Sequence, residues 1–78
     1  MTFPQIDRIT MDPQVMGGKP CIRGMRVTVG MITGMLAVGS SEEELLALYP
    51  YLEPEDIRAA LAYLTWRAEE HEMPLAAA

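Results

Sequence analysis

The chain has one cysteine, Cys21, and this scarcity constrains its fold more than any other feature of its 78 residues. A chain of this length buries a modest share of its unfolded surface, and small secreted domains usually add several disulfides or a metal. One thiol can form neither an internal disulfide nor a multi-thiolate metal site, so we interpret Cys21 as a small packed residue. The sequence therefore predicts a single domain, residues 1–78, that depends on apolar packing and has marginal stability.

Composition and the N-terminal sequence indicate where the chain acts. Half of the residues are apolar, too many for a disordered tail, yet no run approaches the roughly 18 apolar residues that suggest a membrane span. The first residues, MTFPQ, lack the basic and apolar regions of a secretory signal. We therefore expect a cytoplasmic globular protein with no membrane partner.

The first third of the chain is typical of short strands joined by turns. Segments suited to strands occur at 9–11, 21–22 and 26–27, and Asp12-Pro13, Gly17-Gly18 and Gly24 separate them. Each strand is too short to be stable alone, so this β arm, residues 8–27, must pack on the helices or on another copy of the chain. The arm is therefore a candidate dimerisation element.

From residue 28 onward the apolar residues recur with a helical period. Thr28 is placed to cap a first helix and Gly39 to close it. Ser41 and Glu44 have the spacing of a capping box, which predicts the start of a second helix, and Pro50 ends that helix.

A third helix is predicted to begin at Pro54, because proline is well tolerated at the first helical position. It is expected to continue to about Glu72, before Pro74 ends it and leaves a tail at 73–78. The predicted fold class is mainly α: a three-helix helix-turn-helix domain of winged or homeodomain-like type. The bundle occupies residues 28–72 and the short β arm precedes it.

The third helix presents two apolar faces when its residues are placed about 100° apart. We expect the face with Leu61 to point into the core; it comprises Ile57, Ala60, Leu61, Leu64 and Ala68. The opposite face comprises Ala59, Ala62, Tyr63 and Trp66.

So small a domain cannot easily cover both faces of this helix, which leaves one for a partner. Together with apolar residues on the outer side of the first helix, the second face predicts a homodimer interface at Met31, Met35, Tyr63 and Trp66. The alternative is that the β arm covers these residues within one chain.

Charge is unevenly distributed, with a net charge of +2 over residues 1–39 and −7 over residues 40–78. The cations of the first half lie on the arm, at Arg8, Lys19, Arg23 and Arg26. These four residues are the candidate binding site, because such groups can contact DNA phosphates and guanine edges, or the carboxylates of a protein partner. The alternative is that they are scattered surface charges.

The start of the third helix is acidic, with Glu53, Glu55 and Asp56 offset by Arg58 alone. In an ordinary helix-turn-helix protein this turn comes closest to the bases, where carboxylates would face phosphates. Charge therefore argues against the third helix as the DNA-reading element and favours the arm.

No residue pattern indicates catalysis. His71 has no cysteine, serine or metal-ligand partner at a useful spacing, and Gly17-Gly18-Lys19 lacks the spacing of a phosphate loop and is interpreted as a turn. The acidic run 42–44 suits the first turn of a helix. We therefore expect a protein that is not an enzyme, with no cofactor, no metal and no small-molecule substrate.

Two stretches of the chain resemble the domain-of-unknown-function 433 family. They are ITMDPQVMGGKPCIRG followed by MRV, at 9–27, and a second half that includes the Gly39, 41–45 and Tyr49-Pro50 positions and PEDIRAALAY at 54–63. The resemblance implies a helix-turn-helix fold and an antitoxin-like role beside a PIN-like nuclease toxin. At Glu53 the family favours a Thr or Ser cap, so the third helix is expected to lose a good cap.

Three functions remain open at this point. The first is an antitoxin-like subunit that neutralises a PIN-type nuclease and also binds operator DNA, the second is a stand-alone DNA-binding regulator, and the third is a structural dimeric interaction module. The antitoxin role follows from the resemblance, whereas the expectation of a non-catalytic binding protein follows from the residues.

Overall fold

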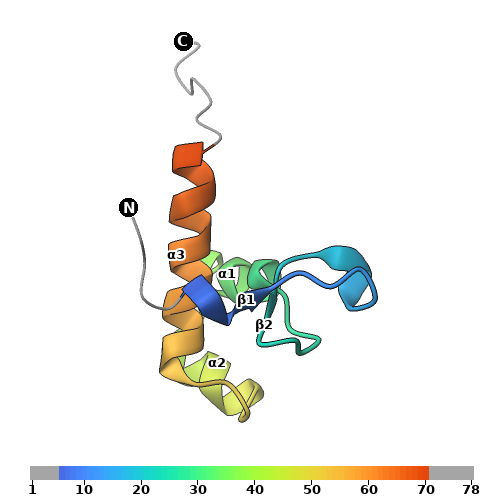
Figure 1. Ribbon diagram of the computed structural model, residues 1–78. Coiled ribbons are helices and arrows are strands. Elements are labelled where there is room, and N and C mark those ends of the chain that lie inside the picture. The colour runs from blue at the N-terminus through green and yellow to red at the C-terminus, as the bar shows by residue number, and fades with distance from the viewer. Residues whose placement is uncertain (1–5, 71–78) are drawn as a thin grey trace.

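The computed structural model describes residues 6–70, and the helices and strands follow the predicted order. Three α-helices, α1 (Val29–Ala37), α2 (Glu42–Leu48) and α3 (Pro54–Glu70), follow a short N-terminal hairpin (Figure 1). The hairpin pairs β1 (Ile9–Thr10) with β2 (Cys21–Ile22), and single 3-10 turns, η1 (Ile6–Arg8) and η2 (Met16–Gly18), precede and interrupt it. The predicted mainly α class, with three helices and a β arm, is confirmed.

Local capping explains where α1 and α2 begin. The Thr28 hydroxyl accepts a hydrogen bond from the Met31 amide at 3.0 Å, and the Ser41 hydroxyl accepts one from the Glu44 amide at 3.1 Å. The Glu44 carboxylate accepts in turn from the Ser41 amide at 2.9 Å, which completes the predicted capping box. Gly39 has a φ of 101°, a conformation that favours glycine, and it follows the end of α1 as predicted.

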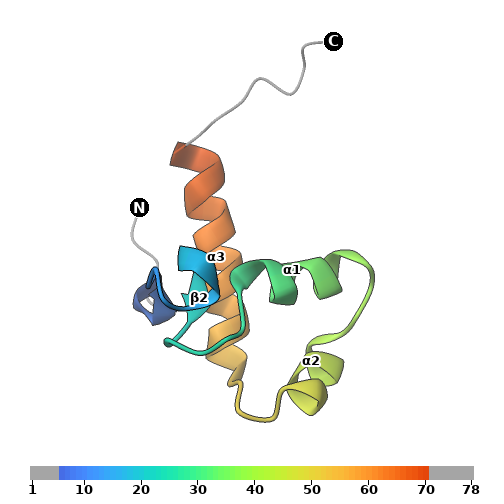
Figure 2. The ribbon, with the colours of Figure 1, turned by 90° about the vertical axis from the view of Figure 1, so that its right-hand side faces the viewer.

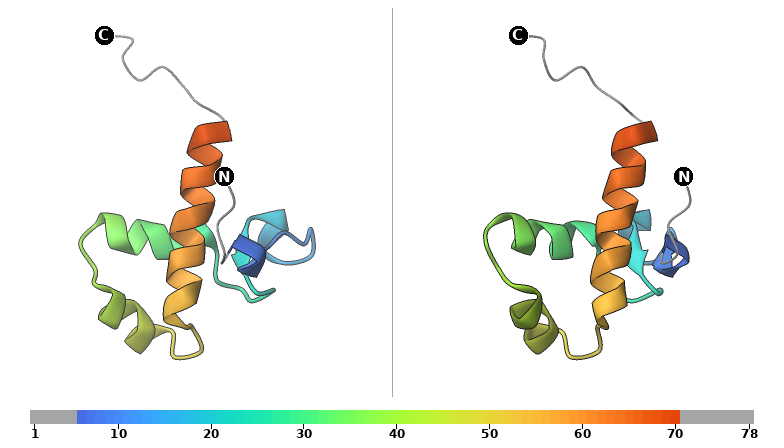
Figure 3. Two further views of the ribbon diagram at one scale, coloured as in Figure 1. Left: turned by 60° about the vertical axis from the view of Figure 1, so that its left-hand side comes forward. Right: turned by 90° about the vertical axis from the view of Figure 1, so that its left-hand side faces the viewer.

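The long helix α3 is the centre of the fold. It begins at Pro54 as predicted and extends through the last described residue, Glu70; the predicted end at Glu72, His71 and the tail at 73–78 lie outside the described residues. The helices α1 and α2 pack on one side of α3, and η1 and the arm pack on another (Figure 3). No helix in the described part of the chain is long and apolar enough to cross a membrane.

One buried cluster joins these elements. Ile22 and Val27 from the arm, Ile32 from α1 and Leu45 from α2 are all at most 1% exposed. They pack in one cluster with residues of α3 that include Ile57, Ala60 and Tyr63. The arm thus contributes directly to the core, which gives a chain with one cysteine more apolar area to bury.

The predicted inward face of α3 is wrong at Leu61 and Leu64, which are 45% and 42% exposed. Ala59 and Tyr63, which were assigned to the partner face, are 0% and 6% exposed. Both faces of the helix are apolar, so hydrophobic pattern alone cannot rank them; packing against α1 and η1 decides which is buried. Toward its C-terminal end the helix also extends past the other described elements (Figure 2).

Candidate partner-binding site

The β arm is held in shape by a tight turn after β2. Ile9 pairs with Ile22 and Thr10 with Cys21, and the Ile22 amide then bonds the Val27 carbonyl at 2.9 Å. Arg23 and Gly24 form the turn between them with φ values of 46° and 73°. Such a conformation is uncommon for a residue with a side chain, so the surrounding contacts must hold Arg23 in place.

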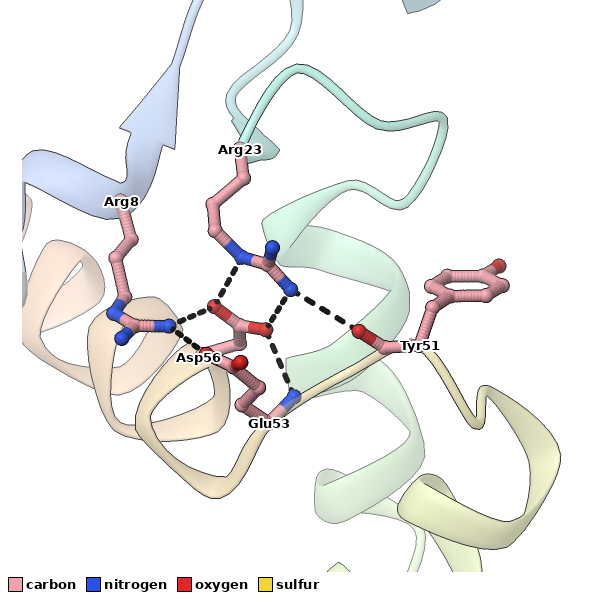
Figure 4. A network of polar contacts seen from close by, with 5 residues as sticks. All are labelled: Arg8, Arg23, Tyr51, Glu53 and Asp56. Atoms are coloured by element: carbon pink, nitrogen blue, oxygen red, sulfur yellow. Dashed lines mark hydrogen bonds and ion pairs between the residues drawn. The ribbon is translucent and has the colours of Figure 1, made fainter.

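Those contacts are ion pairs to Asp56, whose side chain is completely buried at the start of α3 (Figure 4). The Arg23 guanidinium donates through Nε to Oδ1 at 3.0 Å and through Nη2 to Oδ2 at 2.8 Å, a bidentate arrangement. Nη2 also donates to the Tyr51 carbonyl at 3.1 Å. Arg23 therefore fastens the arm to the turn between α2 and α3.

Arg8 binds the same carboxylate from η1. Its Nη1 donates to Oδ1 of Asp56 at 2.9 Å and to Oε1 of Glu53 at 2.6 Å. The Asp56 carboxylate also accepts from the Glu53 amide at 2.9 Å, and this bond caps the first turn of α3. The predicted weakness of this helix start at Glu53 is thus offset by Asp56, three residues later.

The electrostatics of this Asp56 cluster (Arg8, Arg23, Glu53 and Asp56) favour its charged form. Burial by itself would raise the pKa of Asp56, but hydrogen bonds from Arg23, the Glu53 amide and Arg8 outweigh it, and the pKa lies below its ordinary value. Hydrogen bonds to Glu53 and Asp56 raise the pKa of Arg8, and the bond to Asp56 raises that of Arg23. Arg8, Arg23 and Asp56 are therefore charged at physiological pH.

With this arrangement established, comparison with known proteins places the chain. The family model described as "Protein of unknown function (DUF433)" matches residues 9–64, which include both strands of the arm, Arg23, Glu53, Asp56 and most of α3. The chain belongs to the DUF433 family. The resemblance found in the sequence is thus confirmed.

Two relatives extend this comparison. An uncharacterised protein, y4eO, of Sinorhizobium fredii (strain NBRC 101917 / NGR234) is 40% identical over 55 residues, which are 70% of this chain and 25% of that protein. The crystal structure of a DUF433 member from Anabaena variabilis ATCC 29413 is similar with a TM-score of 0.75 and 36% identity, over 81% of this chain and 62% of that one. This DUF433 chain therefore spans about a quarter of the first relative and under two thirds of the second.

The structure divides the four predicted binding cations of this DUF433 chain into two pairs. Arg8 and Arg23 are bound to the Asp56 cluster, with side chains 28% and 37% exposed. Lys19 and Arg26 are exposed, and within residues 6–70 neither forms an ion pair. Lys19 and Arg26 are therefore the arm cations that are free to meet a partner.

The acidic start of α3 also differs from its predicted form. Asp56 was expected to face an approaching phosphate, but it is buried and neutralised, and Glu53 is paired with Arg8. Asp56 therefore no longer counts against α3 as a DNA-reading helix, because its charge does not face the surface. What could have revealed this cluster is the position of Asp56, since an acidic residue at the third helical position often bonds back to the capping residue.

The four predicted dimer residues are not an uncovered surface. Tyr63 belongs to the buried cluster, Met35 packs against it, and Met31 is half-buried, so the chain itself covers much of this face. Trp66 is 36% exposed and lies beside Tyr63, with 6.0 Å between the ring centroids. Tyr63 and Met35 are thus packed within the chain, and the dimer interface at these four residues stays a prediction.

The described residues also bear on a metal or catalytic site. Between residues 6 and 70 there is no group of three or more His, Cys, Asp or Glu side chains placed to hold a metal ion. Cys21 is buried and Gly17-Gly18-Lys19 lies in and after the η2 turn, as the turn interpretation predicts. His71 lies outside the described residues.

Proposed function

We propose that this chain is a non-catalytic, antitoxin-like subunit that binds a PIN-type nuclease through Lys19 and Arg26. The observation that carries the proposal is the division of the arm cations, because it leaves two exposed cations on an arm that Arg8 and Arg23 fasten to the body. A fixed arm presents these groups with little loss of conformational freedom on binding. Family resemblance supplies the identity of the partner.

The chemistry of the two sides is complementary. A PIN-type nuclease holds its metal with carboxylates, and an arginine fork can pair with carboxylates in two parallel hydrogen bonds. Arg26 is the group suited to that role, while Lys19 adds a point charge nearby in sequence. The net charge of −5 for the chain as a whole favours this partner over DNA, which requires an excess of cations.

An inhibition assay tests the proposal. A PIN-type nuclease encoded beside the gene for this chain is assayed for RNA cleavage with increasing amounts of the chain. We expect inhibition near one equivalent, and for Lys19→Ala with Arg26→Ala we expect inhibition at least about tenfold weaker, since lost charge pairs at an interface cost more than 1.4 kcal/mol. Arg67→Ala, which removes an exposed cation from α3, is the matched control and should inhibit normally.

Two results would contradict the proposal: cleavage that continues in an excess of the native chain, or equal inhibition by the native chain and the Lys19, Arg26 variant. The second candidate function, a DNA-binding regulator, is favoured by the same two cations and by the α2–turn–α3 arrangement. It predicts duplex binding that weakens with salt, with a slope reduced by about 0.9 for each phosphate contact that the variant loses. Binding to the nuclease, with no binding to duplex DNA at any salt concentration, would exclude this second function.

A further inference from the structure

One face of α3 carries a row of apolar side chains that the other described residues leave partly exposed. Leu61 and Leu64 are 45% and 42% exposed, and Ala68 one turn later is exposed as well. Counted from the buried Ile57, these residues follow one another at intervals of four, three and four. That is the interval pattern by which paired helices present a continuous apolar seam. We call Leu61, Leu64 and Ala68 the α3 stripe.

The position of the stripe leaves room for another helix. The helices α1 and α2, η1 and the arm pack around the first half of α3, and its second half extends beyond them (Figures 1 and 2). Leu64 and Ala68 lie on this extended half. A second helix can therefore pack on Leu64 and Ala68 without displacing any described element.

Charge indicates which helix fits. Arg58 and Glu69 are both exposed, lie about three turns apart on the same edge of the stripe, and form no ion pair within residues 6–70. In an antiparallel pair of identical helices, Arg58 of each copy can lie opposite Glu69 of the other. The edge is thus complementary to itself when one copy is reversed.

The same register also sets the axial positions of the apolar residues. With Arg58 level with Glu69 of a second copy, Leu64 of that copy lies level with Tyr63, and its Ala68 lies level with Ala59. Leu61 of the first copy then lies between the levels of Leu64 and Ala68 of the second copy. The two-fold symmetry repeats this arrangement at the other end of the helix pair. One register therefore pairs the charges and brings Leu61 of each copy to the level between Leu64 and Ala68 of the other.

From these observations we infer that a second copy of this chain binds antiparallel along the α3 stripe. The inference goes beyond the proposed function, because the dimer forms with or without a nuclease. It also differs from the dimer predicted at Met31, Met35, Tyr63 and Trp66, since it uses the opposite side of α3. A seam of three residues per copy is short, so we expect a weak dimer that forms at tens of micromolar.

Sedimentation velocity of the purified chain, without any partner, tests the inference between about 5 and about 200 µM. We expect the native chain to shift from monomer to dimer over this range, and Leu61→Glu to raise the dissociation constant at least about tenfold. Leu48→Glu on α2, at a residue that is 58% exposed, is the matched control and should dimerise like the native chain. Circular dichroism checks that each variant is folded.

A charge exchange tests the antiparallel register. Arg58→Glu alone places two carboxylates opposite each other and should weaken the dimer, whereas Arg58→Glu combined with Glu69→Arg should restore it to within about threefold of the native dissociation constant. A native chain that stays monomeric at the highest concentration would overturn the inference. So would a charge exchange that fails to restore a dimer weakened by Arg58→Glu, or a Leu48→Glu variant that dissociates as Leu61→Glu does.

Discussion

Replacing Leu45 by alanine is expected to lower the free energy of unfolding by about 2 to 5 kcal/mol, whereas the same replacement at Leu61 is expected to lower it by less than about 1 kcal/mol. Leu45 is fully buried where α2 meets the core cluster, so truncation leaves a cavity. Leu61 is 45% exposed, and water already contacts much of its side chain. Urea denaturation followed by circular dichroism measures both changes.

These two variants remove the same atoms, so only their surroundings differ. In a domain of 78 residues the larger loss approaches the whole stability, and a Leu45→Ala sample is expected to be partly unfolded before urea is added. The comparison is made at a protein concentration where the chain is monomeric, so that the α3 stripe is free. Equal losses for the two variants would mean that Leu61 is buried, so that the face predicted from the sequence is the inward face of α3 after all.

The second large effect is expected at Asp56. Asp56→Asn keeps the size of the side chain but removes the charge that Arg8 and Arg23 share, and we expect a loss of about 3 kcal/mol in the free energy of unfolding. Glu53→Gln is the control: its side chain is 54% exposed and it binds only Arg8, so it should cost less than about 1 kcal/mol. Thermal or urea denaturation distinguishes the two.

The pH dependence of the Asp56 effect has a definite sign. Because the pKa of Asp56 is lower in the folded chain than its ordinary value of about 3.9, its carboxylate contributes full stability above that value. The contribution is lost as the pH falls through the lower, folded-state pKa. The difference in stability between the native chain and Asp56→Asn should therefore shrink as the pH falls from about 5 toward 2. A difference that stayed constant over this range would show that the charge of Asp56 is not what stabilises the fold.

The sequence predicts most of the helix boundaries because capping is local. Thr28 and Ser41 each accept a hydrogen bond from an amide three residues later, and Pro54 lacks the amide that would have no partner at a helix start. A single stretch of sequence therefore contains the whole interaction. The resemblance to the DUF433 family was likewise visible in consecutive residues.

The features that the sequence could not predict depend on distant contacts. Asp56 meets Arg23 across 33 residues and Arg8 across 48, and charge alone shows which groups could pair but not which do. The assignment of α3 failed for a related reason. Both faces carry apolar residues, Leu61 and Leu64 on one and Ala59, Ala62 and Tyr63 on the other. The choice between the two faces depends on where α1 and η1 pack.

Asp56 holds Arg23 in the fold, whereas Arg26, three residues later on the same arm, is free for a partner. Urea denaturation of Arg23→Ala and Arg26→Ala tests this division of the arm cations most directly. We expect Arg23→Ala to lower the free energy of unfolding by about 1 to 2 kcal/mol, because it leaves the buried Asp56 carboxylate short of a partner. This is less than for a fully buried ion pair, since solvent reaches the Arg23 guanidinium. We expect Arg26→Ala to remain within about 0.5 kcal/mol of the native chain. Equal stability of the two variants, or a larger loss for Arg26→Ala, would contradict this division of the arm.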